Sequence, residues 1–205
     1  MIKAIIIFYN DTPEILERCF KSLEGKAEII AIDGAFKDFP HSEPYSTDGC
    51  KELAINYAII YHGVNRSWEN QTEKRNAAFQ YLNDGDYFLV IDADEELIGD
   101  LVPKGDYTDI RIEDWNRDYY RVRLIKYKIG MKYNGRHSII SYGGRCINHA
   151  SINLDAKNMT EGYIKHWKNS RPESRKEYKI KYAEIRNEEP AALVYERLKN
   201  GNHNT

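Results

Sequence analysis

Three short apolar runs, separated by segments with helical spacing, constrain the fold of this chain more than any other feature. The runs cover residues 3–8, 28–33 and 87–91 and are rich in large aliphatic side chains. Continuous apolar runs of this length are typical of strands buried on both faces. Because helical segments at 12–24 and 70–82 lie between them, the order predicts an α/β fold with a mostly parallel central sheet flanked by helices. We expect the strand at 3–8 to lie centrally.

Both longer helical segments begin with recognisable signals. Asp11-Thr-Pro-Glu14 offers an acidic N-cap, a proline in the first turn and a glutamate three residues after the cap. Asn70-Gln-Thr-Glu73 has the pattern of a capping box and opens the segment through residue 82. Weaker signals predict a short helix at 51–57 and a short strand at 58–61.

Composition excludes several classes of protein. The 205 residues are the length of one domain, and the net charge of −2 excludes a broadly cationic surface, so we expect no nucleic-acid partner. Three cysteines without C-x-x-C spacing favour free thiols over a disulfide framework or a zinc site. With no apolar segment of the length of a membrane span or a signal peptide, we expect a protein of the cytoplasm.

The second half of the chain has a different pattern. Polar and apolar residues alternate over 107–112, 119–127 and 138–152, which predicts half-exposed, partly antiparallel strands. Between Lys165 and Lys181, seven basic residues accompany two acidic ones and predict a basic helical tail. This tail is either an ordinary solvated face or a surface for peripheral association with an anionic membrane.

Two carboxylates directly follow the third apolar run. Strand alternation would direct Asp92 and Asp94 to the same side, at the carboxyl end of a parallel sheet. Such a pair can form half of an oxygen site for Mg²⁺ or Mn²⁺, completed by water and phosphate oxygens. The alternative is an acidic loop that caps a following helix. Arg75, in the helix before this strand, can reach a phosphate near the metal, or else it forms a solvated helix face with Lys74.

Several segments carry a family resemblance in this order: Tyr9-Asn-Asp11, Glu28-Ile-Ile-Ala-Ile-Asp33, Lys74-Arg-Asn76 and Phe88-Leu-Val-Ile-Asp-Ala-Asp-Glu95. Together they resemble the family 2 glycosyltransferases of the GT-A fold. The resemblance covers residues 1–98 and extends more weakly to about residue 167. The weaker part is similar to a branch that includes enzymes extending lipopolysaccharide cores, in Arg121-Val-Arg-Leu124, Gly130-Met-Lys-Tyr-Asn-Gly135, His137 and His166-Trp167.

The resemblance implies that the chain binds a nucleotide-diphosphate sugar. It places Tyr9 against the base, Asp33 on the base or ribose, and Arg75 near the diphosphate. An aromatic face can stack on uracil, and a carboxylate can accept a hydrogen bond from its imide N–H. Asp38 and Asp48 compete for the family's next acidic position, and we favour Asp48.

The resemblance also implies a metal cofactor, Mn²⁺ or Mg²⁺. It places Asp92 near the ribose and Asp94 on the metal, whose charge offsets the charge that develops on the departing diphosphate. His166 is then a candidate further ligand, because imidazole with carboxylate and phosphate oxygens suits Mn²⁺.

The catalytic base is less defined. The related branch has His-Glu where this chain has His137-Ser138, so one carboxylate is missing. An inverting transfer needs a base to take the proton of the acceptor hydroxyl. The available carboxylates are Glu113, Asp114, Asp118 and Asp155, and we choose Asp155, which follows an expected strand and precedes His166.

We therefore expect one GT-A domain with a nucleotide-sugar-binding half at 1–98, an acceptor-side half at 99–168 and a helical tail at 169–205. The expected reaction moves a sugar from a UDP-sugar to a glycan, lipid-linked or protein acceptor. The resemblance implies UDP because uracil can stack on Tyr9 and bond to Asp33. A sugar-nucleotide pyrophosphorylase is the first alternative, but residues 8–12 lack the glycine-rich phosphate loop that it needs. A non-catalytic nucleotide-sugar-binding domain is the second.

Overall fold

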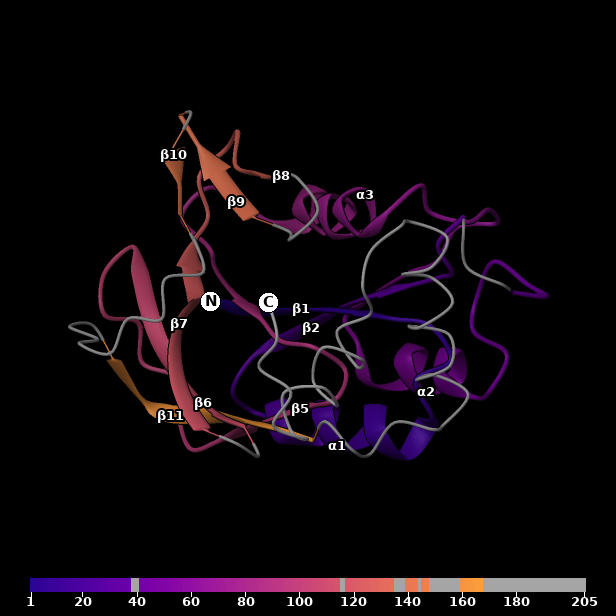
Figure 1. The fold of residues 1–205 in the computed structure, drawn as a ribbon, viewed down its shortest axis with the longest axis horizontal. Coiled ribbons are helices and arrows are strands. Elements are labelled where there is room, and N and C mark those ends of the chain that lie inside the picture. The colour runs from indigo at the N-terminus through magenta and orange to yellow at the C-terminus, as the bar shows by residue number, and fades with distance from the viewer. Residues whose placement is uncertain (38–40, 115–116, 135–138, 144, 148–158, 168–205) are drawn as a thin grey trace, which may run out of the picture.

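The computed structural model describes residues 1–37, 41–114, 117–134, 139–143, 145–147 and 159–167 (Figure 1). The elements are, in chain order, β1 (Ile2–Phe8), α1 (Pro13–Leu23), β2 (Glu28–Asp33), α2 (Cys50–Tyr57), β3 (Ile60–His62), α3 (Gln71–Asn76), the 3₁₀ helix η1 (Ala77–Tyr81), β4 (Tyr87–Val90), β5 (Glu95–Ile98), β6 (Tyr107–Asp114), β7 (Arg117–Lys126), β8 (Lys132–Asn134), β9 (Ile139–Tyr142), β10 (Arg145–Cys146) and β11 (Met159–His166).

Within these residues, eight strands form one sheet in the order β3-β2-β1-β4-β7-β6-β11-β5. The first four strands are parallel, β7 is antiparallel to both β4 and β6, β11 is parallel to β6, and β5 is antiparallel to β11. The central position expected for the strand at 3–8 is confirmed, because β1 lies between β2 and β4. A separate antiparallel sheet, β10-β9-β8, lies near α3 (Figure 1).

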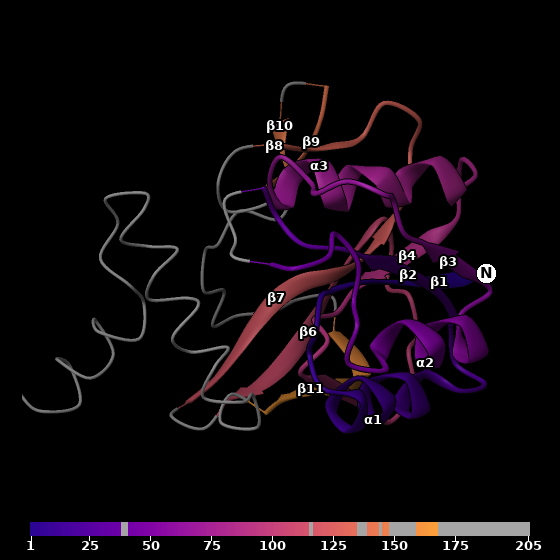
Figure 2. The same cartoon turned by 90° about the vertical axis from the view of Figure 1, so that its right-hand side faces the viewer.

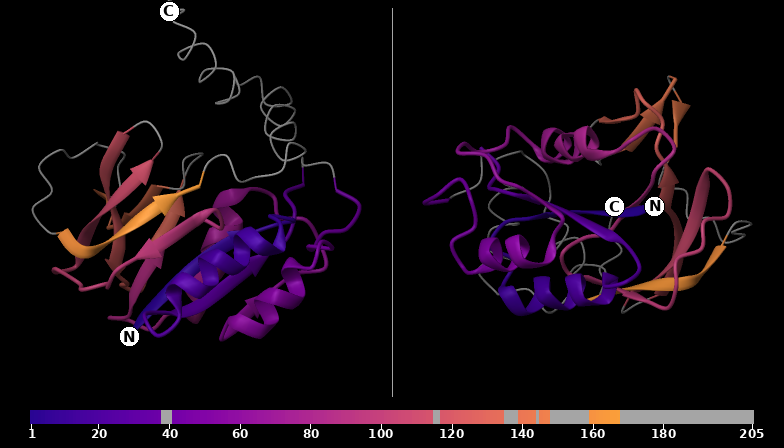
Figure 3. Two further views of the ribbon diagram at one scale, coloured as in Figure 1. Left: turned by 90° about the horizontal axis from the view of Figure 1, so that it is seen from below. Right: turned by 180° about the vertical axis from the view of Figure 1, so that it is seen from behind.

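Helices cover both faces of the parallel part. α1 and α2 lie side by side on one face and α3 lies on the other (Figures 2 and 3). α1 buries Leu16 and Phe20 against Ala4 and Ile6 of β1, as its helical spacing predicted. On the opposite face, the β1 side chain of Ile5 packs in a second cluster with aromatic residues of η1 and β4. Side chains of β1 therefore alternate between two cores, which confirms a strand buried on both faces.

Two local expectations were wrong. The helix predicted over 70–82 ends at Asn76, whose side chain exchanges two hydrogen bonds with the backbone of Tyr133, and continues as η1. Asp11 is not the N-cap of α1, because its carboxylate accepts a hydrogen bond from Tyr9 N at 3.0 Å. Residues 95–98 form β5, which pairs with β11, so the alternative in which the acidic loop caps a following helix does not hold.

The structure tests only part of the expectations for the second half. The alternating segments at 107–112 and 119–127 are β6 and β7, and their antiparallel pairing is confirmed. Lys165 is not in a helical tail but in β11, where its ammonium contacts Glu113 at 4.0 Å. The remainder of the expected tail, from residue 168, lies outside the described residues. None of the helices in the described ranges is long and apolar enough to cross a membrane.

Candidate active site

The candidate site lies at the edge of the sheet where β1, β2 and β4 end. Phe8 and Asp33 are register partners in the parallel pair β1–β2, so the chain leaves both strands side by side. β4 runs parallel to β1 and ends at Val90, two residues before Asp92. The carboxyl edge of parallel strands is where open α/β sheets bind ligands.

Asp33 is fully buried at this edge, and its carboxylate has three donors. Ser46 donates from its backbone N at 3.0 Å and from Oγ at 2.6 Å, and Tyr61 donates from its hydroxyl at 2.9 Å. Burial and the nearby carboxylate raise the pKa of Tyr61, which keeps the phenol protonated as a donor. Asp33 therefore fastens the loop around Ser46 to β2, and its contact with a nucleotide stays a prediction.

The loop that follows β1 is tied to the same segment. The Tyr9 hydroxyl donates to Glu43 O at 3.0 Å, and Asn10 N donates to Ser46 Oγ at 2.9 Å. Asp48 accepts from Thr12 N at 3.1 Å and is exposed. Thr12 has a φ of 74°, which is rare for a β-branched residue. These bonds place Tyr9 and Asp48, the expected nucleotide-binding residues, in one pair of linked loops.

Gly34 is a point of close approach beside Asp33. It has a φ of +127°, and an added Cβ would lie 2.7 Å from Trp68 Nε1 and 2.8 Å from Pro44 O. We expect Gly34→Ala to lower the free energy of unfolding by about 3 kcal/mol, through backbone strain and overpacking together. The matched control is Gly25→Ala, with a φ of +69° and no atom within 4 Å, which should cost about 1 kcal/mol. Equal losses in urea unfolding would show that crowding at Gly34 has no effect.

Lys74 and Arg75 are buried, with relative exposures of 1% and 5%, so their interpretation as a solvated helix face was wrong. The Lys74 ammonium donates to Phe8 O at 2.5 Å and to Gly34 O at 2.6 Å, which joins the ends of β1 and β2. Arg75 Nη2 donates to Asp92 Oδ1 at 2.8 Å. Burial lowers the pKa of Arg75, but Asp92 and Tyr133 together raise it above its usual value, so the guanidinium is charged.

The two acids of the D-x-D pattern lie in a turn and not in a strand. Glu95 N donates to Asp92 O at 2.9 Å and closes this turn. Strand alternation therefore ends before the acids. The Asp92 side chain is 36% exposed and faces Arg75, whereas that of Asp94 is 4% exposed and faces His166.

His166 and Asp94 come together through β11. His166 Nε2 lies 3.3 Å from Asp94 Oδ2, and its Nδ1 lies 3.8 Å from Asp114 Oδ2. A carboxylate and an imidazole are a donor pair that suits Mn²⁺, with other positions left for phosphate oxygens and water. Among the residues that the structure describes, no group of three or more His, Cys, Asp or Glu side chains is placed to hold a metal. A metal held by Asp94 and His166 therefore stays a prediction.

Two further charged residues beside this turn, Glu95 and Arg123, were not among the predicted site residues. Glu95 is buried and accepts hydrogen bonds from Asp92 N and from Arg123. Burial raises the pKa of Glu95, and Arg123 opposes the shift. Arg123 lies within a segment that carried the family resemblance, but no local pattern indicated that it pairs with Glu95.

Buried polar atoms without a hydrogen-bond partner gather around this turn. In the described part of the chain these are Arg75 Nε, Arg123 Nε, Tyr133 Oη and His166 Nδ1. Three of the four belong to side chains that contact Asp92, Glu95 or Asp94, and Arg75 Cζ lies 5.7 Å from the ring of Tyr133. Because buried polar groups are rarely left unpaired, this grouping favours a polar ligand site.

The carboxylates considered as catalytic base differ in position. Asp114 is 5% exposed and lies beside His166, whereas Glu113 contacts Lys165 and Asp118 pairs with Arg111 at 2.9 Å. Asp155 lies outside the described residues, so its role stays a prediction. Of the three described carboxylates, Asp114 is the one next to the expected metal ligands.

His166 gives the site a predicted pH dependence. Burial lowers its pKa, but a hydrogen bond to Asp94 and the charges of Glu95 and Asp114 raise it above 6.5. A raised folded-state pKa means that His166 stabilises the fold below about pH 6.5 and that this stability is lost as pH rises through the folded pKa. We expect the difference in free energy of unfolding between wild type and His166→Gln to shrink from pH 5 to pH 8, as approximate limits. A difference independent of pH in urea unfolding would contradict this.

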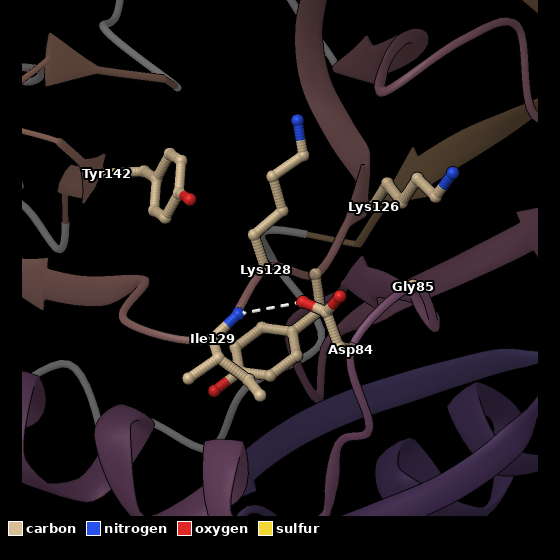
Figure 4. A pocket seen from close by; sticks show the side chains of 7 residues that line it. Asp84, Gly85, Lys126, Lys128, Ile129 and Tyr142 are labelled. Atoms are coloured by element: carbon tan, nitrogen blue, oxygen red, sulfur yellow. Dashed lines mark hydrogen bonds between the residues drawn. The ribbon is translucent and has the colours of Figure 1, made fainter.

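A hollow of about 400 Å³ lies at the other end of β4 from the candidate site (Figure 4). Asp84 and Lys128 line it with the exposed ring of Tyr142, and Ile129 N donates to Asp84 Oδ1 at 3.0 Å. Asp84 precedes β4, whereas Asp92 follows it. The hollow is therefore separate from the candidate site.

The mixed sheet, with helices on both faces and acidic residues after the fourth strand, defines an α/β protein of the GT-A class, as the sequence predicted. The sequence model of Glycosyl transferase family 2 matches residues 3–105, and the chain belongs to this family. No curated protein gives a significant match.

Two crystal structures of S. aureus TarS are similar in part. The structure of TarS 1–349 has 17% identity and a TM-score of 0.37, and covers 47% of this chain and 28% of that chain. The other TarS structure has 15% identity and a TM-score of 0.41, and covers 57% of this chain and 22% of that chain. This chain thus spans less than a third of either TarS chain.

Proposed function

We propose that the protein is a glycosyltransferase that moves a sugar from a nucleotide-diphosphate donor, a UDP-sugar, to an acceptor hydroxyl with inversion. The chain's family already implies sugar transfer, and one observation supports the more detailed proposal. Arg75 from α3, Asp92 and Asp94 from the turn after β4, and His166 from β11 converge at the carboxyl edge of the sheet.

Each residue has a role that its chemistry allows. The base would lie against Tyr9, and the charged Arg75 would bind the diphosphate, exchanging part of its contact with Asp92. Asp94 and His166 would hold Mn²⁺ or Mg²⁺, which supplies positive charge to the departing diphosphate. Asp92 would contact the ribose, with Asp33 and Asp48 holding the loops around the nucleotide.

The acceptor side needs a base opposite the leaving diphosphate. We propose Asp155 for this role, with Asp114 as the competing carboxylate. Removal of the hydroxyl proton by a positioned carboxylate contributes about 10²–10⁴-fold to the rate. The proposed acceptor is a glycan, a lipid-linked acceptor or a protein, and peripheral association of the basic segment after residue 168 with an anionic membrane remains part of the proposal.

The test is a thermal-shift screen of UDP-, GDP- and dTDP-sugars with and without Mn²⁺. A ligand that binds only the folded state raises stability by RT ln(1 + [L]/Kd). We expect a shift with UDP-sugars that depends on Mn²⁺, followed by release of UDP when an acceptor is added. No shift with any nucleotide and metal would refute the proposal, and binding without release of UDP across acceptors would indicate a binding domain.

A further inference from the structure

Glu95 uses both of its carboxylate oxygens to hold the turn that contains Asp92. Its Oε2 accepts a hydrogen bond from Asp92 N at 2.8 Å, and its Oε1 accepts one from Arg123 Nη2 at 2.9 Å. The Glu95 side chain is only 1% exposed. Because the group is buried, neither bond can be replaced by bulk water without rearrangement.

Arg123 joins this contact to the main sheet. Its Nη1 donates to Val90 O, at the last residue of β4, at 3.2 Å, and its side chain is 11% exposed. The charges of Arg123 and Glu95 are opposite, so the pair is compensated within the protein. The turn is thus fixed to the end of β4 by Glu95 through Arg123.

Asp92 is consequently held from two directions. Arg75 contacts its carboxylate from α3, and Glu95 holds its backbone from the other side of the turn. A ligand that binds Arg75 would compete for the carboxylate contact but not for the backbone contact. The bond from Asp92 N to Glu95 can therefore stay in place when the site is occupied.

We propose that Glu95 is a positioning residue that fixes the Asp92–Asp94 turn for binding of a nucleotide diphosphate with its metal, and that Arg123 is its anchor. The inference rests on the proposed function of the site. Glu95 does not touch the ligand in this proposal. Its effect is to hold Asp92 and Asp94 in place before the ligand arrives, which reduces the ordering that binding requires.

Single substitutions of Glu95 leave Arg123 buried without a counter-charge and endanger the fold. Two double variants avoid this. Glu95→Met with Arg123→Met removes both charges and the acceptor for Asp92 N, and Glu95→Gln with Arg123→Met removes both charges but keeps an acceptor oxygen. The two double variants differ mainly in that acceptor oxygen. Comparing them therefore separates the effect of the bond from Asp92 N to Glu95 from the effect of the Glu95–Arg123 ion pair.

We expect the variant with Glu95→Met and Arg123→Met to fold. By calorimetry it should bind UDP with Mn²⁺ at least about 10-fold more weakly than wild type, which is the loss typical when a residue that supports a metal ligand is replaced. The glutamine variant should restore most of this affinity. Glu96→Gln, in the same strand, keeps its acceptor for Trp167 and serves as the matched control. Equal affinity of the two double variants would overturn the proposal.

A second measurement is independent of any ligand. Hydrogen exchange of the Asp92 amide can be measured by NMR without nucleotide. It should be at least about 10-fold faster in the variant with Glu95→Met and Arg123→Met than in the variant with Glu95→Gln and Arg123→Met. Equal protection in both would also overturn the positioning role. If wild type fails to bind UDP with Mn²⁺ while the exchange difference is present, the proposed function fails and the contact between Glu95 and the turn is supported.

Discussion

Asp94→Asn is expected to weaken the binding of UDP in the presence of Mn²⁺ by about 100-fold and to lower turnover by at least as much. Asparagine keeps the size of the side chain but removes the charge that faces His166 at 3.3 Å. The proposed metal site has two protein ligands, so the loss of one charge removes much of the attraction for the cation. Calorimetric titration of UDP with Mn²⁺ into both proteins measures the effect.

The same variant has a readout without substrate. Because the hydrogen bond to Asp94 raises the pKa of His166, the pKa should fall in Asp94→Asn, as an NMR pH titration of the imidazole would show. Asp100→Asn, an exposed carboxylate after β5, is the control and should change neither property. Unchanged affinity for UDP with Mn²⁺ in Asp94→Asn would remove Asp94 from the metal site.

Asp33→Ala is expected to lower the free energy of unfolding by about 4 kcal/mol, because it leaves two buried donors of Ser46 and the partly buried hydroxyl of Tyr61 without their acceptor. For a chain of this length the melting temperature should fall by roughly 8–16 °C. Asp48→Ala is the graded control. Asp48 also accepts hydrogen bonds from two backbone amides, Thr12 N and Cys50 N, but it is exposed, so its loss should cost only about 1 kcal/mol.

This comparison separates two roles for Asp33. A residue that only contacts the nucleotide would lower affinity for UDP when replaced, with little change in stability. A small loss of stability in Asp33→Ala, below about 1 kcal/mol, together with lost UDP binding would contradict the structural role derived from its buried hydrogen bonds. Urea unfolding and calorimetry on the same samples distinguish the two.

The parallel half of the fold and the edge that carries the site could be predicted from the sequence. Apolar runs become β1, β2 and β4 because continuous aliphatic side chains need cover on both faces, and helical spacing supplies that cover in α1. Parallel pairing then brings the residues after β1 and β2 to one edge, since Phe8 and Asp33 share a register position. Local periodicity is sufficient for these elements because their burial pattern repeats within a few residues.

Expectations that depended on local continuity failed where a side chain forms a hydrogen bond with a backbone group. The helix expected to residue 82 changes to η1 where Asn76 binds the backbone of Tyr133. The strand alternation expected through Asp92 and Asp94 ends in a turn, which Glu95 holds. In both places a hydrogen bond formed by a side chain to a backbone group replaced the regular pattern.

Only the tertiary structure decided which charged groups meet at the site. The sequence by itself determined the parallel strands, the edge at which they end and the presence of Asp92 and Asp94 after β4. The pairing of β5 with β11 brings His166 to Asp94, and β7 brings Arg123 to Glu95. No local pattern encodes these pairs, because a buried charge needs a partner but the sequence does not state which distant strand supplies it.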